Sequence, residues 1–96
     1  MPALSEYPNV YNSVLEVIRA KGFEVWRDVD SGLVYGQKDG WDFAADSPVG
    51  LLGLIALWEA RSPEQYSEYW WRQEGETKFL SLPTQPPTYT PVWSAG

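Results

Sequence analysis

The sequence contains no cysteine and no histidine, and only seven of its 96 residues are basic. Without cysteine the chain has no disulfide framework and no thiol nucleophile, and without histidine it lacks the usual general base near neutral pH. Zinc sites of the common kinds are excluded for the same reason. A chain of this length also has little room for a deep cleft between carboxylates. We therefore expect a protein that is not an enzyme and needs no cofactor or metal.

Acidic residues outnumber basic ones by 13 to seven, which gives a formal net charge of −6. This excess argues against nucleic-acid binding, because such proteins present basic faces to the phosphate backbone. Residues 1–6 lack the charged start and apolar run of a signal peptide. The longest apolar stretch, residues 49–58, is about half the length of a membrane span. These features predict a soluble cytoplasmic protein.

The aromatic content, by contrast, is high: 16% of residues, six of them tryptophan. A chain with this much apolar ring area is expected to fold. The first element predicted is a helix over residues 8–21, where apolar residues recur at steps of three and four. Ser5 or Asn9 is suited to cap its start, and Gly22 to end it in a left-handed conformation with Phe23 packed back on Ile18.

Three strands are predicted next, Phe23–Val29, Leu33–Lys38 and Trp41–Ala45, because turn residues separate alternating segments. Two-residue loops at Ser31-Gly32 and Asp39-Gly40 would pair Val29 with Val34, Lys38 with Trp41 and Gly36 with Phe43. One sheet face is then apolar: Phe23, Val25, Val29, Val34, Phe43 and Ala45. The opposite face collects Glu24, Trp26, Asp28, Tyr35, Asp42 and Ala44.

A second helix is predicted after Ser47 as N-cap and Pro48 as its first residue. Its body is apolar on all sides, and Gly50 and Gly53 within it suggest the close approach of another backbone. Ser62 and Pro63 repeat the start signal, so a third helix is expected over residues 63–73. Residues 77–82 have the composition of a short fourth strand, and the tail from Pro83 is rich in proline and extended.

These elements predict an α+β fold: an N-terminal helix, a three-stranded antiparallel meander, and two further helices packed on the apolar sheet face. Residues 1–82 form the single domain, and residues 83–96 are the Pro-rich tail. We expect Tyr89, Pro91 and Trp93 of this tail to pack on the domain or on a second copy. The alternative is that Pro86-Pro87-Thr88-Tyr89, a PPxY sequence, binds a WW domain.

Two motifs have competing interpretations. Asp28, Asp30 and Gly32 resemble the start of a calcium loop, but the later positions of the EF-hand pattern are not met, and a solvated hairpin turn is preferred. Tyr66, Tyr69, Trp70 and Trp71 cannot all point inward from one helix. We expect the first three to join the core and Trp71 to face solvent.

The expected function is a protein-interaction module that offers an acidic surface with aromatic anchors to a basic protein partner, as small inhibitors and immunity proteins do. A homo-oligomeric structural protein that exchanges its Gly50/Gly53 helix or its tail is the alternative. A third hypothesis is a binder of small ligands or carbohydrates by aromatic stacking. The residues expected to contact the partner are Trp26, Asp28, Tyr35, Asp42 and Trp71.

Overall fold

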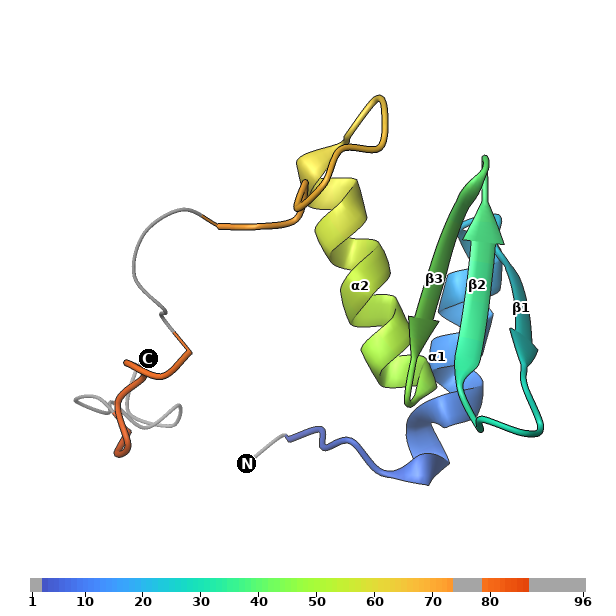
Figure 1. Cartoon of the computed structure of the whole chain (residues 1–96). Helices are drawn as coiled ribbons and strands as arrows, with labels where there is room; N and C mark the ends of the chain where they lie inside the picture. The colour runs from blue at the N-terminus through green and yellow to red at the C-terminus, as the bar shows by residue number, and fades with distance from the viewer. Residues whose placement is uncertain (1–2, 74–78, 87–96) are drawn as a thin grey trace, which may run out of the picture.

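Two α-helices, one 3-10 turn and three strands make up the regular structure in the computed structural model, which describes residues 3–73 and 79–86 (Figure 1). An antiparallel sheet carries both α-helices on one face, so the α+β fold predicted from the sequence is confirmed. The elements follow the chain in the order η1 (Pro8–Val10), α1 (Tyr11–Ala20), β1 (Glu24–Arg27), β2 (Val34–Lys38), β3 (Trp41–Ala45) and α2 (Pro48–Arg61).

The first helix ends as predicted but starts differently. Gly22 takes a φ of +93°, and its N–H donates to the carbonyl of Arg19 at 2.9 Å. The expected caps, Ser5 and Asn9, were wrong, since no side chain caps this end. Pro8 instead opens a 3-10 turn, whose fixed φ suits a helix start. The chain then continues into α1.

The β2–β3 hairpin has the predicted register, with Lys38 opposite Trp41 and Gly36 opposite Phe43. Asp39 and Gly40 take φ values of 52° and 82°. Both central residues of a type I′ turn require a positive φ, and this turn matches the twist of the flanking strands. The Asp-Gly signal therefore identified this turn correctly.

The β1–β2 register differs from the prediction by two residues. Arg27, not Val29, lies opposite Val34, and the connecting loop is longer than the two residues expected. The carboxylate of Asp28 explains the longer loop, because it accepts hydrogen bonds from both the N–H and the hydroxyl of Ser31. A shift of two keeps each strand side chain on its predicted face. The two residues at the end of the predicted strand, Asp28 and Val29, now lie in the loop, and Val29 is 87% exposed rather than on the apolar face.

The core lies between the sheet and the two helices. Phe23 meets Phe43 and Trp58 edge-on, with ring centroids 5.8 and 5.9 Å away. Gly36 lets Leu51 pack closely on the sheet, because a Cβ at this position would lie 3.4 Å from Leu51 Cδ2. The fully packed residues are Ile18, Phe23, Val34, Phe43, Leu51 and Ile55.

Helix α2 begins as predicted, with the Ser47 hydroxyl accepting from the Gly50 N–H at 3.0 Å. The predicted close approach is not found at Gly53, where, its own helix aside, no atom of the described residues lies within 4 Å of the position that a Cβ would take. Ser62 ends the helix in a left-handed conformation, φ 48°, and Pro63 cannot continue it. The apparent N-terminal signal of a third helix is therefore a C-terminal one.

Residues 63–73 contain turns, and the third helix was wrong. Tyr69 takes a φ of +57°, which no helix residue has. Trp70 packs on Trp41, whereas Tyr66 and Tyr69 stay exposed rather than joining the core. The described part of the expected fourth strand, residues 79–82, is also a turn.

The expected docking of Tyr89, Pro91 and Trp93 lies outside the described residues. Over residues 3–73 and 79–86, no helix combines the length and the apolar character needed to cross a membrane.

Candidate functional site

The sheet face turned away from the two helices has no helix over it in the described part of the chain. Strand alternation places six side chains there, and we call this set the outer face. The pairing forms two cross-strand rows, one aromatic and one polar. The outer face consists of Glu24, Trp26, Tyr35, Gln37, Asp42 and Ala44.

Trp26 and Tyr35 form the centre of this face. They lie directly opposite each other on β1 and β2, and their rings stack with centroids 5.5 Å apart and planes 8° from parallel. Such a cross-strand aromatic pair stabilises the sheet and fixes both rings. Trp26 nevertheless remains 46% exposed. The pair is a rigid apolar platform with one side open to solvent.

The polar row beside the platform carries negative charge. Gln37 lies between Glu24 and Asp42 in the register, and all three side chains are exposed. None of the six outer-face positions is Lys or Arg. Several cations are held elsewhere: Lys21 pairs with Glu59 at 3.0 Å, Lys38 donates to the Lys21 carbonyl, and Arg72 lies over the Tyr69 ring at 4.3 Å.

Asp28 directly follows β1, and its carboxylate is bonded within the loop. Its hydrogen bond from the Ser31 hydroxyl, 2.7 Å, and a second from the Ser31 N–H lower the pKa of its carboxyl. These bonds favour the charged form because the donors point at the anion. The carboxylate thus serves the turn, and among the described residues no group of three acidic side chains is placed to hold a metal ion.

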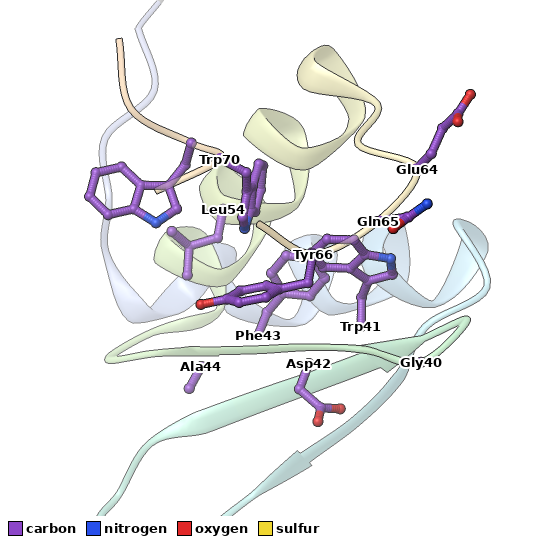
Figure 2. A pocket seen from close by; sticks show the side chains of 11 residues that line it. Gly40, Trp41, Asp42, Phe43, Ala44, Leu54, Glu64, Gln65, Tyr66 and Trp70 are labelled. Atoms are coloured by element: carbon purple, nitrogen blue, oxygen red, sulfur yellow. The ribbon is translucent and has the colours of Figure 1, made fainter. Parts of the chain in front are cut away.

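Trp71 is not on a strand and does not belong to the outer face. It borders a groove of about 560 Å³ between β3, α2 and residues 64–71, which we call the edge groove (Figure 2). Trp41 and Phe43 rise from β3 towards the groove, and Asp42 and Ala44 point to the other side of the strand (Figure 2). The groove is lined by Gly40, Trp41, Asp42, Phe43, Ala44, Leu54, Glu64, Gln65, Tyr66, Trp70 and Trp71.

The structure therefore places Trp26, Tyr35 and Asp42 on one sheet face, and it places Asp28 in the loop after β1 and Trp71 at the edge groove. Asp42 is common to both regions, since it belongs to the outer face and also lines the edge groove. Sequence reasoning missed the groove because it assigned residues 63–73 to a helix. The signal that could have found it was Pro63 directly after a helix-ending position, which releases the following aromatic residues from helical spacing.

Comparison with known proteins gives no relative from which a function could be transferred. No protein-family model matches the chain, and searches of curated proteins and of solved structures find no significant match.

Proposed function

We propose that the protein is a non-enzymatic interaction module that binds a basic protein partner through its outer face. The observation that carries the proposal is the stacked Trp26–Tyr35 pair, open on one side and flanked by carboxylates with no cation among the outer-face positions. No catalytic step is included, because the sequence lacks His and Cys and the acidic groups of this face lie on an open sheet surface.

Two physical effects support this pairing of features. A rigid aromatic ring binds an arginine guanidinium by stacking and cation–π attraction, and loses little conformational entropy in doing so. Carboxylates beside the ring add charge-assisted hydrogen bonds, and a negative surface accelerates the approach of a positive partner. Trp26 would supply the ring, and Glu24 and Asp42 the charges. The net charge of −6 extends the attraction over the whole molecule.

Display selection tests the proposal with random peptides in place of the partner. A peptide library is selected on the immobilised full chain, and we expect the recovered peptides to be enriched in Arg and Lys. Binding of a recovered peptide should fall about tenfold or more in the Trp26→Ala/Tyr35→Ala double variant, since centrally placed aromatic anchors carry much of the affinity of an interface. Fluorescence anisotropy measures the change.

Matched controls separate recognition from general effects. The first control, Tyr7→Ala, removes an exposed aromatic ring away from the sheet. The second control, Glu16→Gln, removes one negative charge on α1 and is matched to Glu24→Gln, which removes one on the outer face. Both controls should bind as the original chain does. Selection of peptides without basic residues, or equal binding by the double variant, contradicts the proposal.

A homo-oligomer is the second candidate. The observation in its favour is on α2, where Gly53 has open space around it and Leu54, at the edge groove, is 39% exposed. A second copy of the helix could approach closely at this glycine.

A further inference from the structure

The sheet ends at β3, and part of the β3 backbone has no partner. Narrow and wide pairs alternate in an antiparallel ladder, and the tight turn makes Lys38–Trp41 a hydrogen-bonded pair. The next such pair is Gly36–Phe43, so the N–H and C=O groups of Asp42 and Ala44 point away from β2. Within residues 3–73 and 79–86, none of these four groups forms a hydrogen bond outside the ladder.

The edge groove lies against these free backbone groups. Five consecutive residues, 40–44, line it from the strand side, and Leu54 and Trp70 line it from the opposite wall. The ring centroid of Trp41 lies 5.6 Å from that of Trp70 and 6.4 Å from that of Tyr66. These three rings form a continuous aromatic surface in the groove. The space beside β3 therefore has main-chain hydrogen-bonding groups on one side and apolar rings on the other.

We propose that an extended segment of the basic partner adds to the sheet as a fourth strand along β3. This inference rests on the proposed function and specifies how the partner binds. Successive side chains of an added strand point to opposite faces. One set would enter the edge groove and contact Trp41, Leu54 and Trp70. The other set would lie beside Asp42 on the outer face, where a cationic side chain is favoured. The segment is thus expected to alternate apolar and basic residues.

The charge of the groove favours a basic segment over a second copy of the chain or the chain's own residues 79–86. Asp42 and Glu64 line the groove, and no Lys or Arg is among its lining residues. A second copy of the chain would bring another six net negative charges to this edge. The chain's own residues 79–86, in which Phe79 and Leu80 are about 80% exposed, carry no cation to place beside Asp42.

The test uses the full chain labelled with ¹⁵N and a capped nine-residue peptide of alternating Val and Arg. Amide hydrogen exchange at Asp42 and Ala44 is expected to slow about tenfold or more at saturating peptide, because these amides gain hydrogen bonds. The amides of Trp41 and Phe43, already paired with β2, should not change. A Val-Glu peptide should not bind. A Val-Arg peptide N-methylated at every second residue, on the edge that would face β3, should bind about tenfold more weakly.

Variants address the same point from the protein side. Ala44→Pro removes an outward N–H, and proline is tolerated at such an edge position. It should weaken peptide binding about tenfold, whereas Ala44→Ser, which keeps the N–H, should not. If Ala44→Pro fails to fold, the N-methylated peptide still decides the question on the unchanged chain.

Other outcomes overturn the proposal in distinguishable ways. Binding that depends on Trp26 and Tyr35 but leaves exchange at Asp42 and Ala44 unchanged would refute strand addition and leave the proposed function intact. If neither the Val-Arg peptide nor any selected peptide binds, both fail. Slow exchange at Asp42 and Ala44 in the free chain that is lost on dilution would identify a second copy as the occupant. Slow exchange that is lost in a chain ending at Gln73 would identify the chain's own C-terminal residues.

Discussion

At the scale of single residues, one carboxylate determined where the sequence-based register failed. Asp28 binds both the N–H and the hydroxyl of Ser31, and this local bonding lengthens the loop between β1 and β2. Aspartate competes in this way with strand pairing wherever a short turn is within its reach. A register predicted only from a two-residue Ser31-Gly32 loop does not take this competition into account. The Asp28 bond is therefore the physical reason that Val29 left the apolar face.

Removing the Ser31 hydroxyl should raise the pKa of Asp28 towards its ordinary value of 3.8. The hydroxyl is the largest cause of the lowered pKa, and Ser31→Thr, which keeps a hydroxyl, serves as the control. Because the folded-state pKa lies below the unfolded one, the stability linked to Asp28 is present above the unfolded pKa and is lost as the pH falls through the folded pKa. NMR titration of the Asp28 carboxyl measures the shift, and identical midpoints in Ser31→Ala and the original chain would contradict the role assigned to the hydroxyl.

At the scale of elements, local signals with one strong physical cause were predicted well. Gly22, the Asp39-Gly40 turn and the Ser47-Pro48 start each fix a backbone conformation by themselves, and all three were confirmed. The outer face followed from strand alternation, because a period of two puts Trp26, Tyr35 and Asp42 on the same side of the sheet. For residues 63–73 the local signal was limited to the helix end at Pro63, because the positions of their rings depend on contacts such as that of Trp70 with Trp41, far away in the sequence.

Residues 49–58 of helix α2 are apolar on all sides, but only part of this surface lies in the core. Two leucines represent the two environments. Leu51 is fully buried, whereas Leu54 is 39% exposed at the edge groove. We expect Leu51→Ala to lower the free energy of unfolding by about 2–5 kcal/mol, because it leaves a cavity among core side chains. Leu54→Ala should cost about 1 kcal/mol or less. Urea denaturation followed by circular dichroism measures both, and equal losses would show that the groove side of α2 is covered.

At the scale of the whole molecule, charge and apolar surface are unevenly divided. Both α-helices cover the inner sheet face, which leaves the acidic outer face open, and the unpaired β3 edge joins this face to the edge groove. The ion pair between Lys21 and Glu59 instead joins the end of α1 to α2, within the packed half. A partner that approaches the β3 side would meet negative charge and exposed rings together.

We expect the full chain to be a monomer of 10.9 kDa in solution, because a net charge of −6 opposes self-association. Light scattering over a range of concentrations measures the mass, both for the full chain and for a chain ending at Leu82. A dimer in both would favour pairing through Gly53 and Leu54 on α2. A dimer that is lost on truncation would favour exchange of the tail.

The order of the elements also has a consequence for how the protein forms during synthesis. Each strand pairs with its neighbour in the sequence, so the meander can assemble through short loops as soon as residue 45 has emerged. Helix α1 precedes the sheet and packs on β1, but the rest of the inner face lacks its cover until Leu51 and Ile55 follow. The interval between these two events spans about ten residues of translation, roughly 0.5–2 seconds at common elongation rates. Because the helix that completes the core follows the sheet so closely, a nascent chain exposes its aromatic layer only briefly.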